Sequence, residues 1–220
     1  MPNLDAFCTK VIYPLLRTFF SLLYHQFAWT YDLVAATVSI GRWKKWIFSV
    51  TPYLTGTHIL EIGHGPGHLI LKLNQASKTI IGLDTSPQMG RITRQRLLRH
   101  KITPCLIRGK AQKLPFRSNS LDHVISTFPA EYIFDIETLN EAYRVIKPQG
   151  TLIILPYAWI TGGNCFDKIA AWIFKVTGEA PRDNNGHLQA LDNTGFLAVS
   201  EKVPLDSSVV QIIRAQKPQN

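Results

Sequence analysis

The chain has 220 residues, and its 24 Lys and Arg against 15 Asp and Glu give a formal net charge of +9. This length suits one compact domain with a well-covered sheet, and the basic excess favours contact with nucleic acid, an acidic lipid surface or a charged substrate. The 3 cysteines are scattered and form no C-x-x-C pair. They argue against a disulfide framework or a metal site, so we expect no metal and a reducing, cytoplasmic location.

The N-terminal segment, residues 1–50, is rich in aromatic side chains, and we expect it to form a helical cap before a compact domain at residues 51–220. Its apolar stretch Val11–Trp29 is broken by proline and polar residues, so it is too polar to span a membrane. Two interpretations stay open. Either these helices only cover one edge of a sheet, or residues 10–46 also contact an anionic membrane surface, which would make the protein peripheral at the membrane.

The stretch His58–His68 reads His-Ile-Leu-Glu-Ile-Gly-His-Gly-Pro-Gly-His, an apolar run that ends in three glycines separated by single residues. Directly after it, Leu69, Ile70 and Leu73 have the spacing of one helix face. The pattern predicts a strand, a glycine turn and a helix, the start of a βαβ unit. Glycines at such a turn let a ligand lie against bare main chain.

The details of this turn favour a nucleoside without phosphates as the ligand. Its glycines do not fit the dinucleotide pattern G-x-G-x-x-G, and the sequence contains no P-loop motif. Glu61, just before the turn, would repel a pyrophosphate but could help to hold a cationic or hydroxyl-bearing ligand. Residues 79–84 predict a second strand that ends in Asp84, whose carboxylate could accept hydrogen bonds from both ribose hydroxyls.

Further elements follow in order. Residues 87–101 predict a basic amphipathic helix, which lacks the aromatic residues that nucleic-acid stacking would need beyond His100. The pattern then predicts three strands, a helix and a final antiparallel hairpin, at residues 104–108, 122–126, 152–155, 165–176 and 196–214.

Several of these stretches together resemble one enzyme family. Glu61-Ile-Gly-His-Gly-Pro-Gly67 and Gly82-Leu-Asp84, with Ser86 and Met89, look like the class I S-adenosylmethionine-dependent methyltransferases. Later landmarks of that family follow in the same order at residues 109–116, 120–125 and 143–150.

The resemblance covers residues 55–157 and implies an α/β fold with a Rossmann-like, doubly wound, seven-stranded sheet. The sheet would be mostly parallel with an antiparallel C-terminal hairpin strand, and helices would cover both faces. The Tyr-Asp pair at residues 31–32 and the Ser-x-Gly and Trp spacing up to residue 46 are similar to ubiquinone/menaquinone-biosynthesis C-methyltransferases. That similarity implies that this segment helps to close the pocket for cofactor and substrate.

The family resemblance implies S-adenosyl-L-methionine as the cofactor. In that family an acid–alanine pair after the third strand contacts the adenine. Here Lys110 replaces the acid, while Ala111 can offer its backbone N–H and Gln112 a side-chain amide. The residues that we expect to bind the cofactor are Glu61, Gly63, His64, Gly65, Gly67, Asp84, Thr85, Met89, Lys110, Ala111, Gln112, Thr127 and Phe128.

Substrate and methyl donor should meet at the end of the fourth strand. Two interpretations of Glu131 and Tyr132 stay open: they act as proton acceptor and hydrogen-bond donor, or they only begin the helix that follows. A lone histidine is more often structural, so His187 is a weaker candidate. The residues that we expect to bind substrate are Tyr31, Pro129, Tyr157 and His187.

The sequence therefore predicts a methyltransferase for a small, lipophilic acceptor: a quinone precursor, a lipid or a hydrophobic metabolite. One alternative is an RNA methyltransferase, which the +9 charge motivates. Another is a non-catalytic protein that binds S-adenosylmethionine. The sequence chooses neither between O, N and C as the methylated atom nor between oligomeric states.

Overall fold

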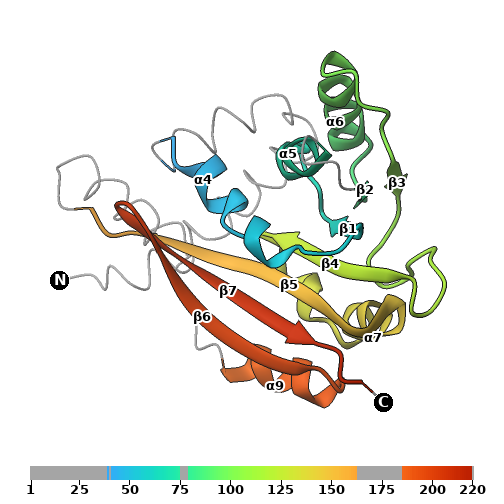
Figure 1. Ribbon diagram of the computed structural model, residues 1–220, viewed down its shortest axis with the longest axis vertical. Helices are drawn as coiled ribbons and strands as arrows, with labels where there is room; N and C mark the ends of the chain where they lie inside the picture. The colour runs from blue at the N-terminus through green and yellow to red at the C-terminus, as the bar shows by residue number, and fades with distance from the viewer. Residues whose placement is uncertain (1–38, 40, 75–78, 163–184, 220) are drawn as a thin grey trace, which may run out of the picture.

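A computed structural model describes residues 39, 41–74, 79–162 and 185–219 (Figure 1). Tyr31, the predicted helix at 165–176 and most of residues 10–46 therefore lie outside the described residues. The described strands form one seven-stranded sheet in the order β3-β2-β1-β4-β5-β7-β6. They are β1 His58–Ile62, β2 Thr79–Asp84, β3 Leu106–Arg108, β4 Leu121–Thr127, β5 Ile146–Ile160, β6 Leu197–Leu205 and β7 Ser208–Gln216.

The pairing confirms the predicted fold class. β3, β2, β1, β4 and β5 pair in parallel, whereas β7 runs antiparallel to both β5 and β6. The last two strands thus form the expected hairpin at one edge of the sheet. The described helices are α4 Trp43–Phe48, η3 Thr51–Tyr53, α5 His68–Asn74, α6 Pro87–Arg99, η4 Glu131–Phe134, α7 Ile136–Val145 and α9 Asn185–Asn193.

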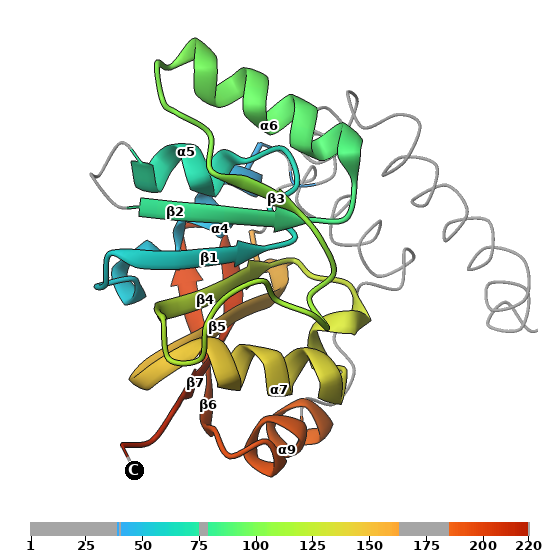
Figure 2. The ribbon, with the colours of Figure 1, turned by 90° about the vertical axis from the view of Figure 1, so that its right-hand side faces the viewer.

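Helices cover both faces of the sheet. Successive side chains of its central strands point to opposite faces, and those on both faces are apolar and buried. In β5, Leu152 and Ile154 belong to a buried cluster with α7 and α9, while Ile153 and Leu155 belong to a second cluster with α4, α5 and α6. Figure 2 shows α5 and α6 on one side of the strands and α7 and α9 on the other. Strands buried on both faces explain the continuous apolar runs in the sequence.

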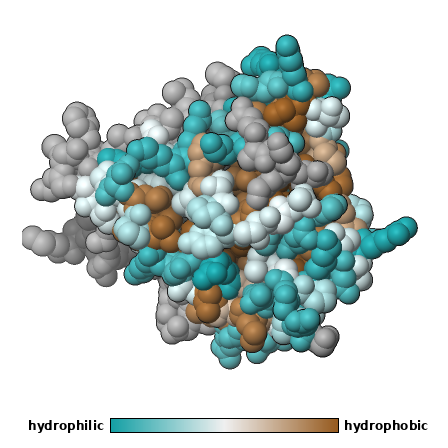
Figure 3. All heavy atoms as spheres, in the orientation of Figure 1, coloured by the Kyte–Doolittle hydropathy of each residue, from teal (hydrophilic) through white to brown (hydrophobic). Residues whose placement is uncertain are grey.

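Helix α6 confirms the predicted amphipathic helix. Ser86 caps its N-terminus by accepting a hydrogen bond from the N–H of Met89 at 3.3 Å, and Pro87 occupies the first helical turn, where no N–H is needed. Met89, Thr93 and Leu97 are buried. The exposed side chains include three arginines, Arg91, Arg94 and Arg99, and this end of the molecule is largely hydrophilic in Figure 3. The basic face that carries these arginines lacks aromatic residues.

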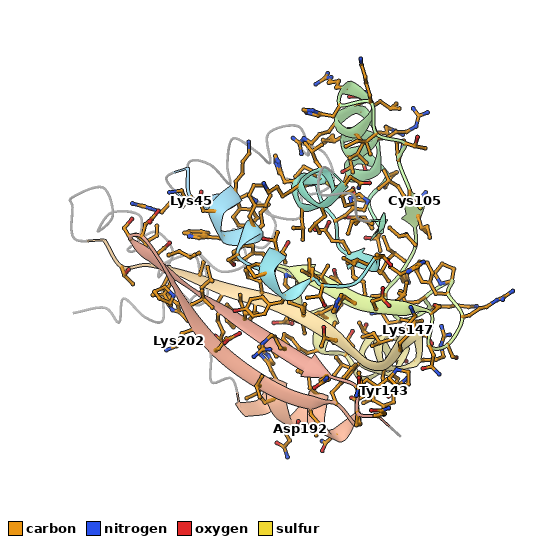
Figure 4. All side chains as sticks on the ribbon, viewed as in Figure 1. Lys45, Cys105, Tyr143, Lys147, Asp192 and Lys202 are labelled. Atoms are coloured by element: carbon orange, nitrogen blue, oxygen red, sulfur yellow. The ribbon has the colours of Figure 1, made fainter. Side chains whose placement is uncertain are left out.

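Helix α4 fixes the described end of the N-terminal segment against the hairpin. Trp46 is fully buried, and its Nε1–H donates to Ser208 Oγ at 2.8 Å. Lys45, labelled in Figure 4, forms an ion pair of 2.6 Å with Asp206 at the hairpin turn. Within the described ranges, no helix combines the length and apolar character needed to cross a bilayer.

Asp122 joins three segments at the end of the sheet opposite the glycine turn. Its Oδ2 accepts the N–H groups of Thr57 and His58, both at 2.9 Å, and its Oδ1 accepts from Lys147 Nζ at 2.6 Å (Figure 4). Burial opposes ionisation of this carboxyl group, but these hydrogen bonds outweigh it and hold the pKa of Asp122 well below its usual range.

Asp122→Asn is therefore expected to lower the free energy of unfolding at pH 7 by about 1–3 kcal/mol, the range for hydrogen bonds to a charged group. Because the folded-state pKa is depressed, the wild-type contribution is present above the unfolded pKa of about 4 and is lost as the pH falls below it. Urea unfolding at several pH values from neutral to acidic measures both effects. A variant with the same pH dependence as the wild type would contradict this account.

Candidate functional site

The glycine turn after β1 adopts a backbone that other residues rarely reach. Gly63, Gly65 and Gly67 have φ values of +70°, +51° and +76°. The N–H of Gly63 donates to the carbonyl of Leu83 at 2.8 Å, which joins the turn to β2. A Cβ on Gly67 would lie 2.3 Å from Thr93 Cγ2, whereas a Cβ on Gly65 would meet no atom within 4 Å. Gly67 is thus needed for packing, and Gly65 borders open space.

Helix α6 holds the outer carbonyl groups of this turn. Thr93 Oγ1 donates to the carbonyl of Gly65 at 2.7 Å, and the Arg96 guanidinium donates to the carbonyl of Pro66. His64 is buried, and its Nδ1 lies 2.8 Å from the same Gly65 carbonyl. Burial lowers the pKa of His64, which favours a neutral ring with the proton on Nδ1. His64 and Gly67 therefore support the turn from behind.

Asp84, at the end of β2, connects the glycine turn to the start of α6. Its Oδ2 accepts the N–H of Gly65 at 3.0 Å, and its Oδ1 accepts the N–H of Ser86 at 2.8 Å. A carboxylate offers about four lone-pair sites. Asp84 can therefore keep both bonds and still accept hydrogen bonds from a ligand.

Glu61 is buried beneath the turn. Its carboxyl group accepts a hydrogen bond from the N–H of Ile70 in the first turn of α5, and its Oε2 has no partner among the described residues. Burial, followed by the nearby charge of Asp84, raises the pKa of Glu61 well above its usual range. Glu61 thus uses a donor at the start of α5 that a phosphate would otherwise take.

A cavity of about 660 Å³ opens at the carboxyl ends of β1 to β4. Most of the predicted site residues line it: Gly63, Gly65, Asp84, Thr85, Met89, Lys110, Ala111, Gln112, Thr127, Phe128, Pro129 and Tyr132. The lining also includes residues that the sequence analysis did not propose for the site: Ile62, Leu83, Ser86, Gly109, Ala130 and Glu137. Strand ends supply most of these residues, and a strand-by-strand search could have found all but Glu137.

The remaining predicted residues lie outside the cavity lining. Glu61, His64 and Gly67 lie behind the turn, and Glu131, Tyr157 and His187 do not border the cavity. Glu131 and Tyr132 are the first two residues of the short helix η4. Asp135, which lies between η4 and α7, has an extended backbone and separates the two helices. Tyr132 reaches the glycine turn: its hydroxyl lies 2.6 Å from the position of a Cβ on Gly63.

Comparison with known proteins finds a match to a methyltransferase domain. The family profile described as a methyltransferase domain matches residues 60–154. A demethylmenaquinone methyltransferase of Symbiobacterium thermophilum is 34% identical over 143 residues, which cover 60% of this chain and 57% of that protein. These matches support a class I S-adenosylmethionine-dependent methyltransferase, similar to the ubiquinone/menaquinone-biosynthesis enzymes. The chain spans less than two thirds of the length of the Symbiobacterium protein.

Two less similar proteins match more of this chain. A ubiquinone/menaquinone biosynthesis C-methyltransferase of Rickettsia prowazekii is 27% identical over 188 residues, 80% of this chain and 75% of that protein. The solved structure of Haemonchus contortus phosphoethanolamine N-methyltransferase 2, with phosphomonomethylethanolamine and S-adenosylhomocysteine, is 18% identical. It has a TM-score of 0.60 over 81% of this chain and 53% of that chain, which shows a shared fold.

Phe128 forms an aromatic wall of the methyltransferase cavity. Its φ of +47° is strained for a residue with a side chain, and its N–H donates to the carbonyl of Leu155 at 2.7 Å. Its ring stacks on Trp43 of α4, with centroids 4.3 Å apart and planes inclined by 25°, and lies 6.2 Å from the ring of Trp46. The described end of the N-terminal segment therefore supports the cavity wall from outside.

His187 packs against η4. Its ring stacks on Phe134, with centroids 3.8 Å apart and an interplanar angle of 2°. Burial lowers the pKa of His187, and its buried Nδ1 has no hydrogen-bond partner among the described residues. His187 thus packs on Phe134, two residues along η4 from Tyr132, and it is not part of the cavity lining.

Proposed function

We propose that the cavity binds S-adenosyl-L-methionine and that the enzyme transfers its methyl group to a small, lipophilic acceptor, with a quinone precursor as the first candidate. The observation that carries this proposal is the cavity itself, in which bare glycine backbone and the Asp84 carboxylate lie side by side. Asp84 would accept hydrogen bonds from the ribose hydroxyls. The match to a methyltransferase domain and the S-adenosylhomocysteine bound in the Haemonchus enzyme support the same cofactor.

The residues present fit an unphosphorylated nucleoside. Open space beside Gly65 would admit the ligand against the main chain. The N–H of Ile70, in the first turn of α5, donates a hydrogen bond to Glu61 and is therefore not available to bind a phosphate. The cofactor would supply a methyl group on a positively charged sulfur.

The protein would contribute mainly positioning to methyl transfer, because the acceptor must approach the methyl group in line with the departing sulfur. The sulfur–methyl bond breaks as the acceptor–methyl bond forms, and a proton on the acceptor leaves to a base or to water. Tyr132 borders the cavity and would donate a hydrogen bond to the acceptor. The exposed Glu131 would have to turn toward the cavity to take the proton.

The relatives guide the choice of acceptor. The Symbiobacterium and Rickettsia proteins are named as demethylmenaquinone and ubiquinone/menaquinone methyltransferases. The apolar side chains of Ile62, Met89 and Phe128 suit a lipophilic molecule. A lipophilic acceptor would also fit the second interpretation of residues 10–46, contact with an anionic membrane surface.

Two measurements test the proposed function. Calorimetry with S-adenosylmethionine should detect binding, and a labelled methyl group should then enter the lipid or small-metabolite fraction of a cell extract. Transfer into the RNA fraction, with steep sensitivity to salt, would replace the proposal with an RNA methyltransferase that uses the basic face of α6. Binding without transfer to any fraction would instead support a non-catalytic binding protein, and absence of binding would refute the cofactor itself.

A further inference from the structure

Glu137 brings a carboxylate to the cavity from an unexpected element. It lies in the first turn of α7, borders the cavity and is exposed, and no described residue donates a hydrogen bond to it. One helical turn later, Glu141 accepts the N–H of Leu114 at 2.7 Å. Since residues four apart share a helix face, Glu137 faces the same loop that follows β3. Its carboxylate therefore lies across the cavity from residues 109–112.

Strand order determines which part of a nucleoside would lie there. The cavity follows the ends of β3, β2, β1 and β4, which are neighbours in that order. With the ribose at Asp84 on β2, the sulfur end would extend over the glycine turn of β1 toward Phe128 on β4. The base would then extend the other way, over the loop after β3. Ala111 of that loop and Glu137 of α7 both line the cavity.

The other polar side chains of this loop, Lys110 and Gln112, bring no negative charge, and of the two only the Gln112 amide oxygen could accept a hydrogen bond. Lys110 carries an ammonium group, which donates hydrogen bonds and accepts none. Gln112 uses its amide nitrogen on Asp135 at 3.3 Å, which holds the loop against the start of α7. On the side of α7, Glu137 is therefore the carboxylate of the cavity lining that a base with an exocyclic amine would contact.

We infer that Glu137 is a specificity-determining residue, whose carboxylate accepts a hydrogen bond from the 6-amino group of adenine. This inference rests on the proposed function, because it takes the cofactor site as given. A carboxylate only accepts hydrogen bonds, so it would favour adenine and repel the 6-oxo group of hypoxanthine. The acid that recognises the base thus comes from α7, and not from the loop after β3, where Lys110 is found.

Calorimetric titration with S-adenosylhomocysteine and S-inosylhomocysteine tests this assignment. The wild type should prefer the adenosyl ligand, and Glu137→Gln should lower that preference about tenfold or more. The adenosyl ligand should weaken while the inosyl ligand tightens, because the glutamine amide can donate to the 6-oxo group. Glu201→Gln is the matched control: it removes the same charge from an ion pair of 3.1 Å with Arg214 on the hairpin and should leave the preference unchanged.

Each outcome has a distinct meaning. If the wild type binds S-adenosylhomocysteine and Glu137→Gln keeps its full preference for adenine, base recognition by Glu137 is wrong while the proposed function stands. Equal weakening of both ligands would show a general effect of charge or packing and would also overturn the inference. Glu137→Ala, measured alongside with a thermal unfolding control, should lower the preference without tightening the inosyl ligand. A wild type that binds neither ligand would refute the proposed function itself.

Discussion

Gly67→Ala is expected to be among the most destabilising single substitutions in the glycine turn. The new Cβ would lie 2.3 Å from Thr93 Cγ2 and 2.8 Å from Thr93 Oγ1, at a φ of +76° that disfavours any side chain. Thr93 cannot easily move away, because it is fully buried and its hydroxyl bonds to the Gly65 carbonyl at 2.7 Å. Overpacking and a left-handed backbone together predict a loss of about 2–5 kcal/mol in unfolding free energy. Chemical denaturation of the ligand-free protein measures it.

Gly65→Ala is the matched control for this prediction. It adds the same methyl group two residues away, at a φ of +51° but with no atom within 4 Å. Only backbone strain of about 1–2 kcal/mol should remain. Thr93→Ser in the Gly67→Ala background removes the nearest atom and should restore part of the stability. If the two alanine variants were equally stable, the contact between the turn and α6 would be refuted.

The same contact shows how far the sequence could predict the fold. The apolar run, the glycines and the spacing of Leu69, Ile70 and Leu73 predicted β1, the turn and α5, because local sequence determines those elements. The packing of Thr93 on Gly67 joins residues 26 positions apart through tertiary structure. No periodicity in either segment indicates it.

Strand length was harder to predict than strand position. The apolar residues 152–155 predicted only the centre of β5, which in fact runs from Ile146 to Ile160. Its first residues include polar side chains and Pro148, and a shift of register between Leu121 and His123 in the pairing with β4 accommodates them. Hydrophobic patterning indicates buried positions, but hydrogen bonding between strands continues beyond them.

The site was predictable where a strand end defines it. Asp84, Ala111 and Thr127 follow predicted strands, and all three line the cavity. Glu137 could not be found this way, because its place depends on where α7 begins and on which loop the helix faces. The extended residue Asp135 separates η4 from α7, and this break sets the direction in which Glu137 points.

Asp84→Ala should weaken the binding of S-adenosylhomocysteine by about 1–3 kcal/mol, or roughly 5- to 150-fold in the dissociation constant. The substitution would remove the carboxylate that we propose for the ribose, and it would also release the N–H groups of Gly65 and Ser86 from their bonds of 3.0 and 2.8 Å. Asp84→Asn is a milder change, because its carbonyl oxygen can keep one of the two backbone bonds. The ligand-free stability of each variant, measured by thermal unfolding, reports the loss to the turn, and calorimetry reports the loss to the ligand. If affinity in Asp84→Ala equalled that of the wild type, the ribose could not lie at the end of β2, and the orientation that places adenine beside Glu137 would be wrong as well.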